Sequence, residues 1–288
     1  MGIFFTSLLT FYELTTATSL IHLVFLPSHV LSNNECGIEA SSHLVHHNPW
    51  LVFVEFFQSG HLTHLRCGGT LIDSRHVVTA AHCVRSTCGT RRFFKTLILS
   101  CSLKVRLGEY DLETKQECVE GICTEQVVEI DVEDILVHEE YEGVKHDIAV
   151  LRLKEDAPYT DFIRPICLPS GKLSPKTTFI AAGWGIIPRL GEFSHTKKII
   201  PLPYVNFDTC QNVYKNIQLP KHVICAGGEE NIDTCSGDSG GPLVVVNKRS
   251  ELWGVVSAGN VNCGTKGYPG IYTSVADHLD WLKAVIQK

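Results

Sequence analysis

The sequence predicts an all-β protein that closes with one α-helix. Short runs of β-branched and aromatic residues, separated by turn residues, recur from Trp50 onward at a spacing typical of a barrel or a sandwich. Near the C-terminus the pattern changes, because a capping-box sequence, Ser274-Val-Ala-Asp277, precedes apolar residues at helical spacing. The predicted strands are residues 51–57, 70–72, 77–79, 104–107, 127–130, 148–153, 178–181, 243–246 and 252–256, and the apolar face of the helix carries Val275, Leu279, Leu282 and Ile286.

The charge pattern of the 288-residue chain argues against nucleic acid and membrane as partners. The formal net charge is −6, and acidic and basic residues are mixed along most of the chain instead of forming a basic stripe. After the first thirty residues no uncharged apolar run is long enough to span a bilayer. The basic cluster Arg91, Arg92 and Lys95 is interpreted as a solvated loop, with a binding patch as the alternative.

Twelve cysteines are spread over the whole chain, which predicts six disulfides and an oxidising, extracellular compartment. No Cys-x2-Cys pair occurs, so the sequence does not support a zinc ribbon. Residues 1–32 are interpreted as an atypical signal peptide, with an apolar stretch at residues 20–26 and the small Ser32 in the cleavage region. The expected positive start is missing, since no Lys or Arg precedes Arg66. A buried N-terminal segment or an unnatural N-terminus remains the alternative.

Three separate segments carry the residue types of a nucleophilic hydrolase: His82 in Thr79-Ala-Ala-His82-Cys83, Asp147 after His146, and Ser239 within Gly237-Asp238-Ser239-Gly240-Gly241. A serine hydroxyl is a weak nucleophile and needs a base within hydrogen-bond reach. Histidine suits that role, and a buried carboxylate fixes its tautomer. Glycines beside the serine allow backbone N–H groups to turn toward a developing oxyanion.

Each of these segments has an ordinary alternative when taken alone. His82 could be a core histidine, Asp147 could end a strand, and the glycine-rich loop could cradle a phosphate. That loop lacks the Lys-Ser/Thr pair of a P-loop, however. Together, in the chain order His, Asp, Ser, the three segments are highly specific, and they resemble the catalytic triad of chymotrypsin.

Three further segments extend this pattern: Val-Arg-Leu-Gly-Glu-Tyr-Asp at residues 105–111, Cys118-x4-Cys123, and Arg-Pro-Ile-Cys-Leu-Pro at residues 164–169. From Pro49 to the C-terminus the chain resembles the trypsin/chymotrypsin family of serine proteases, and it is most similar to secreted arthropod proteases that often carry a clip domain. No clip domain is recognised. The resemblance implies two packed six-stranded antiparallel β-barrels with a C-terminal helix in residues 49–288, preceded by a short light-chain or activation segment at residues 33–48.

The resemblance also implies roles for individual residues. The general base is His82, its orienting carboxylate is Asp147, the nucleophile is Ser239, and the oxyanion hole consists of the N–H groups of Gly237 and Ser239. The substrate pocket comprises Asp233 at its floor, which implies cleavage after Arg or Lys, with Gly259 and Gly270 in its walls and Ser257 at its base beside the triad. An exposed turn is the alternative for Asp233. The implied disulfides are Cys67–Cys83, Cys210–Cys225, Cys235–Cys263, Cys36–Cys167 and Cys118–Cys123, which leaves Cys88–Cys101.

The chain departs from the family pattern in the activation segment. Family zymogens are cut before an Ile-Val-Gly-Gly-like sequence, and the new α-ammonium pairs with the carboxylate that corresponds to Asp238. Between Cys36 and Pro49 this chain has no Arg or Lys, and Ile38, the candidate for the new terminus, follows Gly37. Two interpretations follow. In the first, the segment is altered and the chain does not mature normally. In the second, the protease is unusual, and it is either cut elsewhere or stays a zymogen-like scaffold.

Smaller features leave alternatives open. Ala258 stands where the family usually has Trp, which predicts weaker binding of extended substrates. Glu109 belongs either to a calcium loop or to the surface. The His61-x2-His64 pair is interpreted as a solvated loop, since no third zinc ligand is near.

The sequence therefore predicts a secreted, trypsin-like serine endopeptidase that acts through an acyl-enzyme, in a proteolytic cascade of immunity or development. The expected partners are protein substrates and serpin-type inhibitors, the expected state is a monomer, and no cofactor or metal is required. The rival hypothesis is a non-catalytic protease homologue that binds and regulates cascade proteins.

Overall fold

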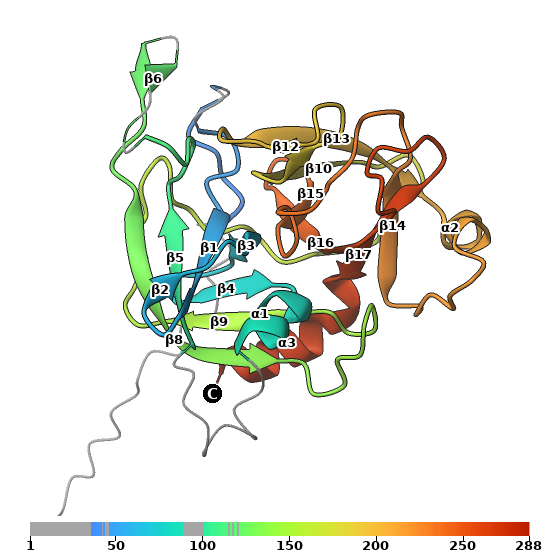
Figure 1. Ribbon diagram of the computed structural model, residues 1–288, viewed down its shortest axis with the longest axis horizontal. Coiled ribbons are helices and arrows are strands. Elements are labelled where there is room, and N and C mark those ends of the chain that lie inside the picture. The colour runs from blue at the N-terminus through green and yellow to red at the C-terminus, as the bar shows by residue number, and fades with distance from the viewer. Residues whose placement is uncertain are drawn as a thin grey trace, which may run out of the picture. The chain divides into compact units, whose positions relative to one another are not determined.

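Two closed β-barrels make up most of the described structure, a computed structural model (Figure 1). It describes residues 36–41, 43, 46–88, 101–114, 116, 118–119 and 121–287, and for residues 86–88 it describes only the backbone. The predicted signal peptide at residues 1–32 and the basic cluster Arg91, Arg92 and Lys95 lie outside these residues. Within them, no helix is long and apolar enough to cross a bilayer.

The first barrel consists of six antiparallel strands in the order β1-β3-β4-β9-β8-β5, and it closes because β1 pairs with both β3 and β5. Its residues alternate between the interior and the surface on β5, as the period-2 sequence pattern requires. The strands are β1 (Leu51–Gln58), β3 (Cys67–Leu71), β4 (His76–Thr79), β5 (Cys101–Leu107), β8 (Val128–Val137) and β9 (Ala149–Leu153), and the short β2 (His61–Leu62) extends β1.

The second barrel also has six antiparallel strands and closes in the order β10-β13-β14-β17-β16-β15. Phe179, Leu202 and Tyr272 are fully buried in its core. The strands are β10 (Thr178–Gly183), β13 (Lys198–Val205), β14 (Val223–Gly227), β15 (Pro242–Val245), β16 (Glu251–Ala258) and β17 (Pro269–Ser274). The all-β fold with two six-stranded barrels is thereby confirmed.

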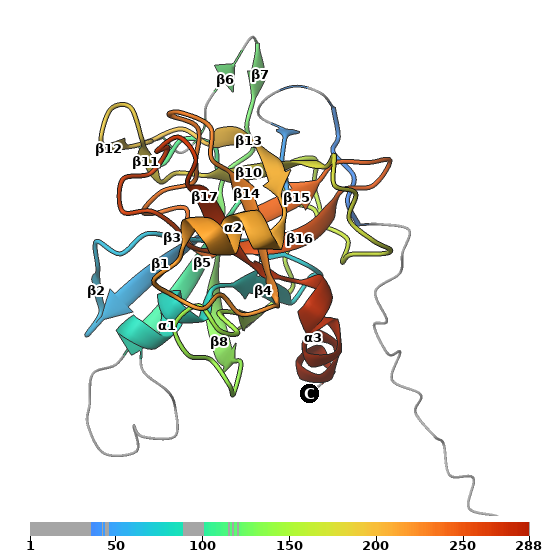
Figure 2. The same ribbon diagram turned by 90° about the vertical axis from the view of Figure 1, so that its right-hand side faces the viewer.

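Two hairpins and two short helices complete the connections. The hairpins are β6 (Cys118–Val119) with β7 (Ile122–Cys123), and β11 (Ile186–Ile187) with β12 (Glu192–Phe193). Helix α1 (Ala81–Cys88) follows β4, and α2 (Phe207–Val213) begins at Asn206, whose side chain accepts the N–H of Thr209. In Figure 2, α2 lies on the outside of the second barrel.

The predicted C-terminal helix is present but begins later than its sequence pattern suggests. Ala276–His278 form a 3-10 turn, and α3 covers Leu279–Ile286. Ser274 Oγ accepts the Asp277 N–H at 3.3 Å, which is one half of the predicted capping box. Val275, Leu282 and Val285 pack into the hydrophobic core of the first barrel, so the chain leaves the second barrel and returns to the first.

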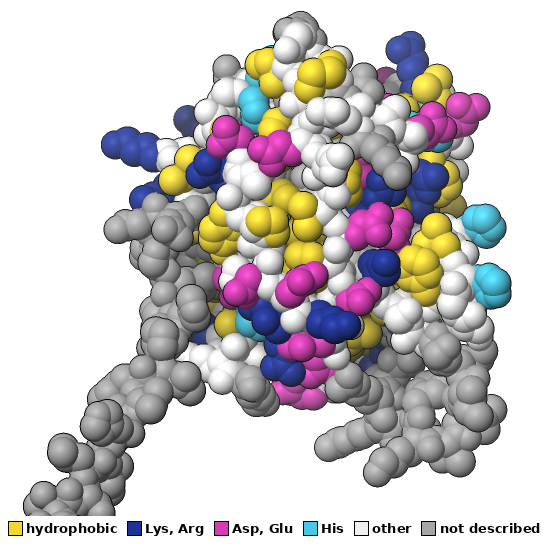
Figure 3. All heavy atoms as spheres, turned by 90° about the vertical axis from the view of Figure 1, so that its left-hand side faces the viewer, with side chains coloured by type: hydrophobic (Ala, Val, Ile, Leu, Met, Phe, Trp, Pro, Cys, Tyr) yellow, Lys and Arg dark blue, Asp and Glu magenta, His cyan; other side chains and the backbone are white. Residues whose placement is uncertain are grey.

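The surface of the first barrel carries charges of both signs. Figure 3 faces the side on which β5 and β8 lie and shows acidic and basic side chains interspersed there. Arg75 and Arg152 each place a guanidinium nitrogen 3.0 Å from Glu133 Oε1. The first barrel therefore has a surface of mixed charge, with ion pairs among its side chains.

The two barrels approach each other closely at a pair of glycines. The Gly68 N–H, on β3, donates to the Ser239 carbonyl at 2.7 Å, and a Cβ on Gly68 would lie 3.0 Å from the Cα of Gly241. Larger residues at these positions would push the barrels apart. The glycines thus set the seam along which the predicted site residues lie.

Candidate active site

His82 and Asp147 form the first half of the site, and both come from the first barrel. Asp147 is 1% exposed, and its Oδ2 lies 2.7 Å from His82 Nδ1. His82 is the second residue of α1, where backbone N–H groups have no intrahelical acceptor. Its N–H donates to Asp147 Oδ1 at 2.8 Å. The carboxylate therefore fixes the position and the tautomer of the imidazole. With the proton of the neutral ring on Nδ1, the lone pair is on Nε2.

The second barrel contributes two more contacts to Asp147. Ser257, near the end of β16, donates its hydroxyl to Asp147 Oδ2 at 2.6 Å. Thr273, on β17, donates its hydroxyl to the Asp147 carbonyl at 2.9 Å. Asp147 of the first barrel is thus held by two hydroxyls of the second, its carboxylate by Ser257 and its backbone carbonyl by Thr273. The sequence placed Ser257 beside the triad but gave no signal for Thr273.

Ser239 lies in the loop before β15, on the second barrel, and its carbonyl is bound by Gly68 of the first. The N–H of Gly240 donates to Val256 at 2.9 Å, and the N–H of Gly241 donates to Asp238 at 2.9 Å. These bonds form a tight turn around the serine. The described structure therefore places the three predicted triad residues along one seam between the barrels.

Gly237 occupies a position that only glycine suits. Its φ is +96°, and a Cβ there would lie 2.8 Å from Phe193 Cε1 and 3.0 Å from the Cα of Gly185. The carbonyl of Ser236 accepts the N–H of Ile186 at 2.9 Å. In a trans peptide the carbonyl and the next N–H point in opposite directions. The Gly237 N–H is therefore directed away from Ile186.

Asp233 is a buried carboxylate with one oxygen unused. It is 4% exposed, and Oδ2 accepts the N–H of Gly264 at 3.1 Å. Oδ1 has no hydrogen-bond partner among the described residues. Burial raises the pKa of Asp233 to about 6. The alternative of an exposed turn for Asp233 is wrong.

The surroundings of Asp233 are shaped by small residues and a buried tyrosine. A Cβ on Gly259 would lie 3.8 Å from the Cα of Gly270, so these two predicted wall residues face each other. Thr234 Oγ1 lies 2.9 Å from the hydroxyl of Tyr272, which is fully buried. Burial raises the pKa of Tyr272 well above its usual value. Sequence reasoning missed Thr234 and Tyr272, since nothing in their local sequence marks them.

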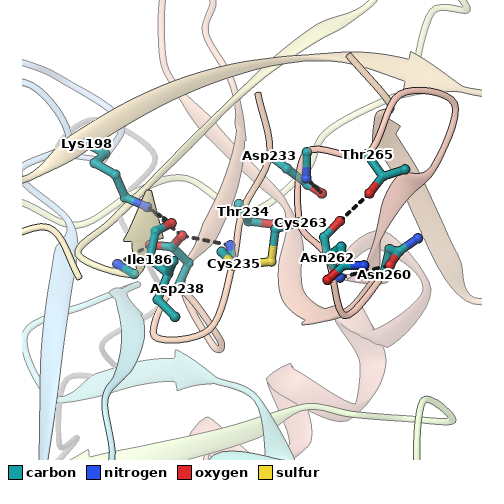
Figure 4. The surroundings of a disulfide bond; sticks show 12 residues. Ile186, Lys198, Asp233, Thr234, Cys235, Asp238, Asn260, Asn262, Cys263 and Thr265 are labelled. Atoms are coloured by element: carbon teal, nitrogen blue, oxygen red, sulfur yellow. Dashed lines mark hydrogen bonds and ion pairs between the residues drawn. A yellow bond between two sulfur atoms is a disulfide. The ribbon is translucent and has the colours of Figure 1, made fainter. Parts of the chain in front are cut away.

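Asp238 is fully buried beside the Ser239 turn and accepts three hydrogen bonds (Figure 4). Gly185 N–H donates to Oδ1 at 2.7 Å, and Cys235 N–H donates to Oδ2 at 3.0 Å. The third donor is the Lys198 ammonium, at 2.9 Å from Oδ2. The sequence left Asp238 without a partner in the uncut chain, and the structure supplies one from β13.

The segment at residues 36–41 is bound elsewhere. The N–H of Gly37 donates to the Pro165 carbonyl at 2.8 Å, and Ser250 N–H donates to the Gly37 carbonyl at 2.8 Å. Ile38, the candidate for an activated terminus, is 36% exposed. In this state Ile38 is therefore not the partner of Asp238.

Five disulfides form in the described residues, with the pairings that the resemblance implies. The predicted Cys88–Cys101 pair lies outside the description, because the side chain of Cys88 is not described. The five are Cys36–Cys167, Cys67–Cys83, Cys118–Cys123, Cys210–Cys225 and Cys235–Cys263.

The described surroundings of Glu109 do not fit a calcium site. Its side chain is 1% exposed and forms an ion pair with Arg106, while Oε1 accepts the Tyr110 N–H at 3.1 Å. Calcium requires a cage of oxygen ligands, and here a guanidinium takes the place of the cation. Glu109 is only 4% exposed, so the alternative of a surface glutamate is wrong, and burial raises its pKa to about 7. His61 and His64 are both exposed.

Comparisons with known proteins agree with this geometry. The family model described as Trypsin matches residues 37–282. The chain belongs to the trypsin family of serine proteases. It is 35% identical to the CLIP domain-containing serine protease HP8 of Bombyx mori, over 91% of this chain and 74% of that protein. It is 37% identical to the Serine protease ea of Drosophila melanogaster, over 94% of this chain and 72% of that protein. It is 36% identical to the Drosophila Spaetzle-processing enzyme, over 83% of this chain and 63% of that protein.

Proposed function

We propose that the protein is an active endopeptidase that cuts after Arg or Lys. The observation that carries the proposal is Asp233 Oδ1, a buried carboxylate oxygen without a partner in the described residues. An unpaired buried carboxylate is costly, and a substrate guanidinium or ammonium would supply the missing hydrogen bonds and charge. The facing glycines 259 and 270 leave room for a long side chain.

The proposed chemistry gives a role to His82, Ser239 and the two N–H groups of the oxyanion hole. His82 Nε2 takes the proton of Ser239 Oγ, and the oxygen attacks the carbonyl carbon of the scissile bond. The N–H groups of Gly237 and Ser239 stabilise the oxyanion. His82 then protonates the leaving amine, which yields an acyl-enzyme and a new N-terminus. Water repeats the sequence on the ester and regenerates the hydroxyl.

Hydrolysis of chromogenic peptides tests this function. Peptides that differ only in Arg, Lys or Phe before the scissile bond are offered to the secreted protein, with Ser239→Ala as the inactive control. We expect arginyl and lysyl peptides to be cleaved and the phenylalanyl peptide to be nearly inert. Faster cleavage of the phenylalanyl peptide would contradict the role of Asp233.

The second candidate function is a non-catalytic regulator of other proteases. It is favoured by the activation segment, which has no Lys or Arg between Cys36 and Pro49. A fluorophosphonate probe separates the two functions, because it labels only a serine with an assembled triad. If no labelling occurs before or after treatment with proteases, the regulator is the better account.

The setting is part of the same proposal. We expect residues 1–32 to act as a signal peptide, residues 33–48 to stay attached as a light chain through Cys36–Cys167, and residues 49–288 to form the protease domain. The relatives include a Spaetzle-processing enzyme and a phenoloxidase-activating enzyme, which supports a place in an extracellular cascade. Serpin-type inhibitors are the expected regulators of such an enzyme, and light scattering should give the mass of a monomer.

A further inference from the structure

The ion pair between Lys198 and Asp238 points to a property beyond the proposed peptidase activity. The inference drawn from this ion pair rests on that proposed activity. Asp238 is 0% exposed and its neighbour in sequence is the proposed nucleophile, Ser239. A buried carboxylate needs both hydrogen bonds and an opposite charge. Lys198 Nζ lies 2.9 Å from Asp238 Oδ2, and the Lys198 side chain is only 15% exposed. Among the described residues, this ammonium is the cation bonded to Asp238.

The surroundings of the pair are shaped to hold the carboxylate in this position. A Cβ on Gly185 would lie 2.5 Å from Asp238 Cγ and 2.6 Å from its Oδ2. A Cβ on Gly183 would collide with Oδ1 of the same carboxylate. Because neither glycine can be enlarged without moving Asp238, the loop after β10 fits the carboxylate in its observed orientation.

Lys198 also connects to the peptide that carries the proposed oxyanion-hole donor. Its ammonium donates to the Ile186 carbonyl at 3.2 Å, and the Ile186 N–H donates to the Ser236 carbonyl at 2.9 Å. The peptide between residues 236 and 237 is thereby held with its carbonyl toward Ile186 and its N–H on the opposite side. Lys198 thus binds the turn before Ser239 directly at Asp238 and reaches its residue 236 through Ile186; Figure 4 shows Lys198, Asp238 and Ile186 together.

The sequence and contacts of the N-terminal segment bear on which cation pairs with Asp238. No Lys or Arg occurs before Arg66, so a protease that cuts after basic residues finds no cleavage site there. Cys36 is tied to Cys167, and Gly37 is hydrogen-bonded to residues 165 and 250. These contacts hold the segment away from Asp238, and Lys198 is the described cation that pairs with this carboxylate.

We propose that Lys198 is a positioning residue that keeps the oxyanion hole formed in the uncut chain, so that the protein is active without cleavage in residues 36–48. Lys198 touches neither the substrate nor the reacting atoms. It acts through Asp238 and Ile186, which hold the turn at residues 236–239. The ammonium comes from within the chain, so no new terminus has to be generated.

The test measures the rate of fluorophosphonate labelling of the full secreted chain. Reducing gels and N-terminal sequencing first establish that residues 36–66 are uncut. We expect the uncut wild-type chain to be labelled, and Lys198→Met to lower the labelling rate and the kcat for an arginyl peptide by about 100-fold or more, as loss of one oxyanion-hole donor does. The change should fall on kcat more than on KM. Lys248→Met, at an exposed lysine before β16, is the matched control and should match the wild type.

A second variant separates positioning from folding. Lys198→Met leaves Asp238 buried without a cation, so the protein can lose stability as well as activity. In the double variant Lys198→Met with Asp238→Asn no charge is left unpaired, and we expect the melting temperature to recover while labelling stays low. Ethylammonium added to Lys198→Ala should restore part of the labelling rate, because it supplies the missing cation.

The outcomes also distinguish this inference from the proposed function. If uncut wild type is unlabelled and a cut form is labelled, the inference is wrong and the protease function stands. If uncut Lys198→Met is labelled as fast as wild type, Lys198 does not position the turn. If wild type is labelled in neither form, the proposed function fails and this inference with it.

Discussion

The Ser257 hydroxyl lies 2.6 Å from Asp147 Oδ2, the same oxygen that lies 2.7 Å from His82 Nδ1. A residue of the second barrel therefore orients the carboxylate on which the histidine of the first barrel depends. The site is a joint product of both barrels, and a change in their contact should alter the chemistry as well as the stability.

Ser257→Ala removes one of the donors to Asp147 and should lower kcat/KM about 10-fold, because a buried acceptor that loses a donor costs about 1–3 kcal/mol. The effect should appear mainly in kcat, since Ser257 holds the carboxylate behind the histidine. Ser102→Ala, at an exposed position of β5, serves as the control. A kcat equal to that of wild type would show that Asp147 needs only His82.

Asp233→Asn should strongly slow cleavage after Arg and Lys and at the same time stabilise the fold at neutral pH. Burial raises the pKa of Asp233 to about 6, so keeping it ionised at pH 7 costs about 2 to 3 kcal/mol. The amide removes that cost and keeps a similar shape. Urea denaturation at pH 7 measures the gain, and an unchanged or lower stability would contradict the assigned burial cost.

Binding of benzamidine, a small cation, should strengthen as pH rises through about 6. The ligand binds the ionised form of Asp233, and below the pKa of about 6 the carboxyl in the free protein is protonated. Isothermal titration at pH 5, 6, 7 and 8 measures the affinity and the proton release. An affinity that is flat over this range would mean that the cation does not bind to Asp233.

A stack of histidines next to Asp147 predicts loss of stability in mild acid. The His146 ring lies between those of His138 and His222, with centroid distances of 4.3 and 4.0 Å. Burial, with a smaller contribution from the neighbouring His146 and His278, lowers the pKa of His222 to about 4. The unfolded chain therefore binds more protons than the folded protein between about pH 6.5 and 4, so stability falls as pH falls through this window.

His222→Gln should make that acid dependence shallower, because one proton fewer is taken up on unfolding. The amide oxygen can still accept the His146 N–H, which His222 Nε2 accepts at 3.2 Å. Denaturation midpoints from pH 4.5 to 7.5 measure the slope. An unchanged slope of stability against pH would mean that carboxylates or other histidines account for the acid sensitivity.

The sequence predicted the triad because each of its residues lies in a short contiguous motif with its own chemistry. It also predicted nine strand runs that all overlap observed strands. It missed three strands of the second barrel, β13, β14 and β17. In β13, Pro201 and Pro203 interrupt the run, and proline has no N–H for a ladder. In the structure Pro201 is exposed while Ile200 and Leu202 are buried, so the alternation survives the prolines.

The partner of Asp238 could not be predicted for a different reason. Lys198 is 40 residues away in sequence, and the contact exists only because β13 runs beside β10 in the closed barrel. Two adjacent lysines at the start of a strand look like a solvated end, whereas here Lys197 is buried and Lys198 points at a carboxylate. Pairings of this kind depend on strand register, which local patterns do not specify.

The central claim, that this trypsin-family chain is an active protease specific for basic residues, is tested most directly by burst kinetics with an arginyl ester. We expect a rapid burst of product equal to about one equivalent per chain, since the acyl-enzyme forms on Ser239 before water releases it. Asp233→Asn should slow the burst, and Ser239→Ala should eliminate it. Absence of a burst in the folded wild-type chain, or a burst of equal size in Ser239→Ala, would contradict the claim.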